Sequence, residues 1–174
     1  MNRFRFLTSF ALSIALPLAL ALPAASQAQT SGVSKVRIST SMGDIEAELY
    51  ADKAPKTVAN FLQYVRDKHY DGTIFHRVIA GFMVQGGGYD AQYKEKKTRP
   101  PVPHEGRQAL AAGLKNTTGT LAMARTNDPQ SATAQFFINV VDNAFLDPTP
   151  QQWGYTVFGK VVSGMDTIQK IKST

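Results

Sequence analysis

The sequence predicts a mainly β protein, an antiparallel barrel or sandwich capped by two α-helices. Its apolar residues fall mostly in short runs, several of which alternate with polar residues. Glycine, proline, asparagine and aspartate separate these runs at short intervals. Only residues 54–70 and 163–172 space their apolar side chains along one helical face. Many short strands with few helices are typical of barrels and of sandwiches, and the pattern leaves both open.

The first residues have the three-part organisation of a secretory signal peptide. Arg3 and Arg5 form a basic start, an apolar run covers residues 6–22, and small residues follow it. Ser26 and Ala28 fit the cleavage pattern. We therefore expect residues 1–28 to be a signal peptide cleaved after Ala28, in preference to a retained anchor. The product would be a periplasmic monomer with no stable membrane insertion, folded as one domain over residues 33–174.

Composition excludes several classes of protein. The chain has no cysteine, so disulfides and thiolate zinc sites are excluded. Its formal charge of +6 falls to +4 when Arg3 and Arg5 are removed, because no acidic residue leaves with them. Much of the excess lies in residues 93–99, where four basic side chains surround Glu95. This pattern indicates a solvated basic loop, and we expect no nucleic-acid partner.

Residues 34–40 and 44–50 predict an N-terminal hairpin with one buried face. Apolar and charged residues alternate in both segments, and residues 41–44 have turn chemistry. The apolar period then changes to that of a helix over residues 54–70, with Pro55 near its start and Asp71-Gly72 after its end. The apolar stripe of this helix consists of Val58, Phe61, Leu62 and Val65.

A second hairpin is predicted within residues 75–88, "FHRVIAGFMVQGGG". Its turn lies near Ala80-Gly81, so Arg77 and Gln85 are expected opposite each other on one face. Met83 shares that face with Gln85, because side chains alternate along a strand. The hairpin therefore combines a cation, an amide and a thioether, with Phe82 at the turn.

The rest of the chain predicts a long loop, three strands and a final helix. Residues 86–119 are rich in glycine, proline, lysine and asparagine and indicate a loop. Residues 119–125, 135–140 and 155–162 have the composition of strands. The final helix would have Ser163 as its cap and an apolar stripe of Met165, Ile168 and Ile171.

Most catalytic machinery is absent from the sequence. The three histidines, His69, His76 and His104, show no metal-ligand spacing, and no nucleophile or phosphate-binding motif occurs. We expect His76 to be a hydrogen-bonded structural residue. Asp142 and Asp147 are more consistent with turn chemistry than with acid–base catalysis. A site for an uncharged substrate with one arginine remains, and we expect no metal or cofactor.

Five segments resemble, in order and spacing, the signature segments of the cyclophilin family of peptidyl-prolyl cis-trans isomerases. They are "FHRVIAGFMVQGGG", "GTLAMAR", "SATAQFFIN", "NAFLD" and "YTVFGKVVSGMD". The resemblance extends over residues 33–172 and is greatest to bacterial periplasmic cyclophilins. It implies a closed eight-stranded antiparallel β-barrel capped by two α-helices. Family members continue beyond the position of "KIKST", so we expect the last strand to be missing and its neighbours unpaired.

The resemblance also implies functional roles for individual residues. Arg77 matches the catalytic arginine, and Gln85 would orient it or contact the peptide. The implied substrate-binding residues are Phe82, Met83, Ala124, Arg125, Thr126, Gln135, Phe137, Phe145, Leu146 and Tyr155.

Four of these positions depart from the pattern of animal cyclophilins. Arg125 and Thr126 stand where those members usually have asparagine and alanine. Phe145 stands where they often have tryptophan, which implies weak cyclosporin binding, and Tyr155 stands where they have histidine. Trp153 does not align with the family's tryptophan.

The implied substrates are proline-containing segments of folding exported proteins. A guanidinium that donates to the prolyl nitrogen would bind the twisted bond better than the planar one, and would accelerate rotation. The alternative is a non-catalytic module or holdase chaperone that binds proline segments. The presence of Arg77 favours the enzyme, because binding alone does not need such a donor.

Overall fold

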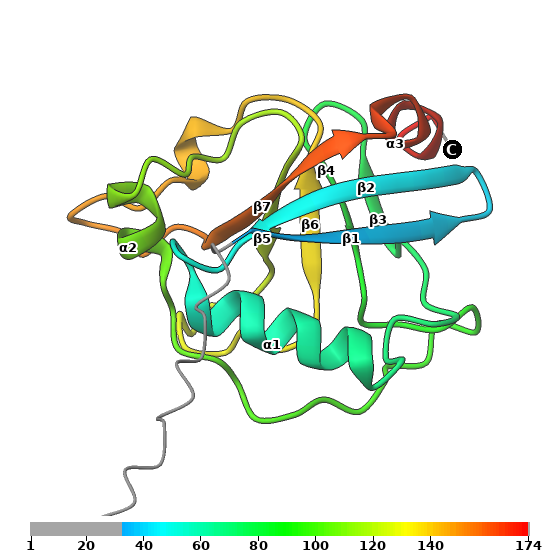
Figure 1. Cartoon of the computed structure of the whole chain (residues 1–174), viewed down its shortest axis with the longest axis horizontal. Coiled ribbons are helices and arrows are strands. Elements are labelled where there is room, and N and C mark those ends of the chain that lie inside the picture. Colours follow the sequence, from blue (N-terminus) through cyan, green and yellow to red (C-terminus); the bar gives the residue numbers. More distant parts are fainter. Residues whose placement is uncertain (1–32, 174) are drawn as a thin grey trace, which may run out of the picture.

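The computed structural model describes residues 33–173, and the expected signal peptide lies outside them. The described chain contains seven strands, three α-helices and one 3₁₀ helix (Figure 1). The strands are β1 (Val33–Thr40), β2 (Gly43–Tyr50), β3 (Arg77–Ile79), β4 (Met83–Gly86), β5 (Thr120–Met123), β6 (Phe136–Asn139) and β7 (Val157–Ser163). The helices are α1 (Pro55–Arg66), α2 (Gly106–Ala111), η1 (Ala144–Leu146) and α3 (Met165–Ile171).

All seven strands form one antiparallel sheet in the order β1-β2-β7-β5-β6-β4-β3. The predicted mainly β class is therefore confirmed. The sheet is not closed among the described residues, because β1 and β3 are its two ends and do not pair with each other. A cavity of ≈ 1030 Å³ is lined by β1, by residues 70–75 and by Val78 of β3. The closed eight-stranded barrel that the resemblance implies is therefore not formed by the described residues, whose single sheet has seven strands and two unpaired edges.

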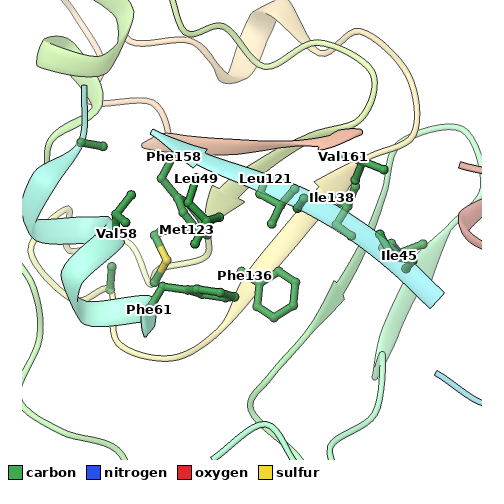
Figure 2. Close-up of a cluster of buried hydrophobic side chains, with 14 of the residues drawn as sticks. Ile45, Leu49, Val58, Phe61, Leu121, Met123, Phe136, Ile138, Phe158 and Val161 are labelled. Atoms are coloured by element: carbon green, nitrogen blue, oxygen red, sulfur yellow. The ribbon is translucent and has the colours of Figure 1, made fainter. Parts of the chain in front are cut away.

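The hydrophobic core lies between the inner face of the sheet and α1. Figure 2 shows Val58 and Phe61 of α1 among side chains from β2, β5, β6 and β7. The ring centroid of Phe61 lies 5.4 Å from that of Phe136 and 5.2 Å from that of Phe158. The inner face of β2 is fully buried at Ile45, as the alternation predicted. This core holds the central strands in register and fixes the outer face of the sheet.

The buried stripe of α1 differs from the predicted one at its C-terminal end. Val65 is 41% exposed, whereas Tyr64 is buried. The Tyr64 hydroxyl accepts a hydrogen bond of 2.7 Å from the backbone N–H of Arg99. The loop that contains Arg99 therefore covers the Tyr64 side of the helix, which the apolar pattern could not show.

Two further expectations about helices were wrong. Ser163 is the last residue of β7 and does not cap α3; the cap is Gly164, with φ +88° and no side-chain bond. The left-handed backbone there turns the chain sharply between strand and helix, which favours glycine. The segment 86–119 also contains the short helix α2, so three α-helices are present where two were expected. Among the described residues, no helix is long and apolar enough to cross a membrane.

Candidate active site

A second apolar cluster lies on the outer face of the sheet, opposite the core. Met83 and Phe137 belong to it, whereas their neighbours Val84, Phe136 and Ile138 point into the core. The two faces alternate because successive side chains of a strand point in opposite directions. The buried members of the outer cluster are Met83, Ala122, Phe137, Leu146 and Val157, and the half-buried ones are Phe82, Leu114, Ala124 and Tyr155.

Arg77 lies beside this cluster at the end of a chain of polar side chains. Arg77 pairs with Gln85 across the β3–β4 hairpin, and Gln85 pairs with Phe137 of β6. The Arg77 guanidinium donates to Gln85 Oε1 at 3.4 Å, and Gln85 Nε2 donates to Gln135 Oε1 at 2.9 Å. The predicted register is confirmed, and an exposed cation stands next to a preformed apolar surface.

Two aromatic rings form the rim of the cluster. Phe82 stacks on Phe145 of η1, with ring centroids 5.7 Å apart and planes 23° apart. Phe145 is 65% exposed. The Phe82 backbone is fixed, because its carbonyl accepts hydrogen bonds from Val140 N–H at 3.1 Å and Asn143 Nδ2 at 3.0 Å.

A buried asparagine network supports this rim, and the sequence analysis missed it. Asn143 Nδ2 also donates to Asn139 Oδ1 at 2.7 Å. Asn139 Nδ2 in turn donates to Thr120 Oγ1 at 3.0 Å and to Asn116 Oδ1 at 3.2 Å. The only signal in the sequence is an asparagine that follows the apolar run "FFI". Since buried amides need partners, this residue predicts a polar network but not its members.

Arg125 and Tyr155 form a second, more tightly bound part of the rim. The Arg125 guanidinium lies 4.7 Å from the Tyr155 ring centroid and donates twice to the Gly154 carbonyl, at 3.1 and 2.9 Å. It also donates to the Thr126 carbonyl at 2.8 Å. The Tyr155 ring meets Phe137 edge-on at 5.5 Å. Arg125 therefore holds Tyr155 against the apolar cluster, a role the spacing of residues did not indicate.

The remaining predicted residues lie at the same end of the cluster. The Ala124 N–H donates to the Gln135 carbonyl at 3.0 Å, which continues the pairing of β5 and β6. The exposed Thr126 donates its hydroxyl to Ser131 Oγ at 2.8 Å, which ties down the loop that follows. Leu146 enters from η1 and is buried. The predicted site residues thus come from β3, β4, β6, η1 and the loops beside them.

The titratable side chains near the site are a buried histidine and two carboxylates. Burial lowers the pKa of His76 below its ordinary value. His76 Nδ1 is buried and has no hydrogen-bond partner within residues 33–173, whereas the Ile74 backbone and the Gln135 side chain interact with the ring and oppose the lowering of its pKa. The expected hydrogen-bonded histidine is therefore satisfied in part. Asp142 and Asp147 accept hydrogen bonds from the backbone N–H groups of Thr118 and Asn116, so these two carboxylates fasten a distant loop and do not form the local turn bonds that were predicted. The described part of the chain contains no cluster of His, Asp and Glu able to hold a metal.

This chain belongs to the cyclophilin family. The family model described as cyclophilin-type peptidyl-prolyl cis-trans isomerase matches residues 35–174. The resemblance noted from the sequence is therefore confirmed over nearly all of the described chain. The chain is a cyclophilin-type peptidyl-prolyl cis-trans isomerase.

Named relatives and solved structures agree with this assignment. The chain is 56% identical over 143 residues to peptidyl-prolyl cis-trans isomerase cyp18 of Streptomyces antibioticus, covering 80% of this chain and 84% of the relative. It is 56% identical over 140 residues to peptidyl-prolyl cis-trans isomerase B of Escherichia coli, covering 79% and 83%. A crystal structure of a Cryptosporidium parvum cyclophilin, determined in the presence of the dipeptide Ala-Pro, is 29% identical with a TM-score of 0.62. The matched region covers 80% of this chain and 85% of the Cryptosporidium parvum chain.

Proposed function

We propose that this isomerase accelerates rotation about X-Pro bonds by a hydrogen bond from Arg77 to the prolyl nitrogen, while the outer apolar cluster holds the proline ring. The observation that carries the proposal is the exposed Arg77 guanidinium, held by Gln85 beside the surface of Met83 and Phe137.

The chemistry explains why a guanidinium suits this site. Rotation about a peptide bond costs about 18–20 kcal/mol, because amide resonance is lost at the twisted midpoint. The twisted prolyl nitrogen is pyramidal and carries a lone pair that the planar amide lacks. A donor aimed at this nitrogen binds the twisted state more strongly than either planar state, which is the condition for catalysis. Arginine remains charged and offers several fixed donors.

The rest of the barrier reduction would come from positioning. A shortening from about a hundred seconds to about a millisecond corresponds to roughly 7 kcal/mol at about 1.36 kcal/mol per tenfold. One oriented donor supplies about 3–4 kcal/mol. Phe82, Met83, Phe137 and Leu146 would hold the ring and exclude water. The backbone near Ala124 and Arg125, together with Phe145 and Tyr155, would hold the flanking peptide while the bond turns.

We further propose that the substrates are proline-containing segments of folding exported proteins. The signal-like residues 1–28 support export to the periplasm. An open rim, with Phe145 largely exposed, is suited to an extended polypeptide more than to an enclosed small molecule. The protein would act there as a monomer and without a cofactor.

The test is the exchange rate of a short Ala-Pro peptide, measured by NMR with the purified protein and two variants. We expect Arg77→Ala to lower the catalysed rate about 100- to 1000-fold, because it removes the proposed donor. Arg66→Ala, a change of the same kind at the exposed end of α1, should leave the rate unchanged. Both variants should unfold at the same urea concentration as the parent.

The binding-module alternative gives a different result. A folded parent that binds the peptide without changing its exchange rate would contradict catalysis by this chain. A folded Arg77→Ala variant with full activity would leave the isomerase but remove the proposed role of Arg77. Isomerase activity that is present in the parent and in Arg66→Ala but lost in Arg77→Ala would support both catalysis by this chain and the role of Arg77.

A further inference from the structure

We propose that Gly88 is a positioning residue of the active site. Its lack of a side chain leaves the space in which Gln135 lies, and Gln135 then holds Gln85 beside Arg77. The inference rests on the proposed function of Arg77 and Gln85. It adds a residue that is not among the members of the outer cluster.

The space at Gly88 is occupied by one side chain. A Cβ atom built on Gly88 would lie 2.6 Å from Cγ, from Cδ and from Nε2 of Gln135. These distances are far below van der Waals contact, so a side chain at position 88 and the present Gln135 conformation exclude each other. Gly88 does not have a positive φ, so the φ angle of its backbone does not by itself require glycine.

The backbone of Gly88 cannot easily move away. Its carbonyl accepts a hydrogen bond of 2.9 Å from Lys96 N–H. The carbonyl of Gly87 is bonded to His69 Nε2 at 3.0 Å, and the carbonyl of Tyr89 accepts from Ile74 N–H at 3.0 Å. Three consecutive residues are thus held by the surrounding chain. The flexible Gln135 side chain would give way first.

Displacement of Gln135 would reach Arg77 through two hydrogen bonds. The Gln135 amide accepts the bond from Gln85 Nε2, and the opposite end of the Gln85 amide accepts from Arg77. When the Gln135 amide moves, Gln85 loses the partner that fixes its orientation. The Arg77 guanidinium then samples more directions, and the fraction aimed at the substrate decreases.

The two preceding glycines differ from Gly88 in their surroundings. A Cβ on Gly87 would lie 3.2 Å from the carbonyl of Ala134, and φ at Gly87 is +86°. A Cβ on Gly86 would lie 3.0 Å from the carbonyl of Ile74. At both positions a side chain meets backbone and would disturb folding. Only at Gly88 are the nearest atoms those of a side chain from the proposed site.

A double-mutant cycle tests the inference through isomerase kinetics. We expect Gly88→Ala to lower kcat about tenfold, with a smaller change in KM and an unchanged urea midpoint. Gln135→Ala removes the three atoms that the new Cβ would meet. Gly88→Ala should therefore have no further effect in the Gln135→Ala background. Gly81→Ala is the matched control, because no atom lies within 4 Å of a Cβ at that position.

NMR of the side-chain amides gives a readout that does not depend on Arg77. The Gln85 NH₂ signals should move in Gly88→Ala toward their positions in Gln135→Ala, and should not move in Gly81→Ala. If Arg77→Ala retains activity, the proposed role of Arg77 fails, but this shift still measures positioning by Gly88.

Three results would overturn the inference. The first is Gly88→Ala with the activity and Gln85 signals of the parent. The second is a Gly88→Ala effect of equal size with and without the Gln135 side chain. The third is a Gly88→Ala protein that fails to fold, which would make Gly88 a packing residue like Gly86 and Gly87.

Discussion

A single buried amide, that of Asn143, connects two parts of the proposed site. Its Nδ2 donates to the carbonyl of Phe82 in the β3–β4 turn and to Asn139 at the end of β6. Asn143 also immediately precedes η1, which carries Phe145 and Leu146. Asn143 therefore links the backbone that carries Phe82 to the segment that carries Phe145.

We expect Asn143→Ala to reduce the free energy of unfolding by about 1–3 kcal/mol, because it removes a donor from the buried Asn139 Oδ1. The KM for a proline peptide should rise, since the Phe82 carbonyl loses one of its two hydrogen bonds. Urea unfolding and peptide kinetics measure the two effects. Asn127→Ala, at an exposed position in the loop after β5, is the control. An unchanged unfolding curve would contradict the network.

At the scale of elements, α1 is capped by a residue far away in the sequence. Its N-cap residue, Ala54, has no side chain that can accept a hydrogen bond. The carboxylate of the buried Glu105 accepts instead from Lys56 N–H at 3.1 Å and from Thr57 N–H at 2.8 Å. It also accepts from the Thr57 hydroxyl at 2.7 Å. A negative charge at this end of the helix also interacts favourably with the helix dipole.

Glu105→Gln should lower the free energy of unfolding by about 1–3 kcal/mol, because an amide NH₂ would face N–H donors at the start of α1. Chemical denaturation measures this change. Glu95→Gln, which removes the same charge from an exposed loop position, should change stability little. Equal stability of the two variants would show that α1 does not depend on this cap.

At the scale of the whole molecule, all three histidines have a pKa below the ordinary value. Burial is the largest cause of this lowering at His69, His76 and His104. His104 shows the geometric consequence, because its Nδ1 accepts from Gly106 N–H while Nε2 bonds to the Gly154 carbonyl. If His104 Nδ1 took up a proton, its N–H would face the N–H of Gly106. The charged ring would also lie near the cations of Arg125 and Arg107.

Stability should therefore fall as the pH is lowered from 7.5 to 5.5. Unfolded histidine titrates near pH 6.5, whereas the folded groups titrate lower. In this range the unfolded state binds more protons, and acid favours it. Urea unfolding at pH 7.5, 6.5 and 5.5 checks the slope. In His104→Gln the slope should be smaller, by no more than about 1.36 kcal/mol per pH unit. A parent with no pH dependence in this range would contradict the expectation.

The sequence was most informative where a pattern is local. Alternation in residues 35–50 predicted the β1–β2 hairpin, and the turn at Ala80-Gly81 predicted that Arg77 pairs with Gln85. Prediction failed where a distant segment decides burial. Tyr64 is buried and Val65 exposed because the loop of Arg99 covers one side of α1. The short helix α2 was missed, since a six-residue helix gives little periodic signal.

By itself, the sequence determined the strands, the hairpin register, the family and the residue types of the proposed site. These follow from side-chain period, turn chemistry and order along the chain, which are local properties. Only the tertiary structure decided that Glu105 caps α1, that Asn143 anchors Phe82 and that Gln135 fills the space at Gly88. Each of these contacts joins residues tens of positions apart. Their partners are selected by packing in three dimensions, and no local pattern carries that information.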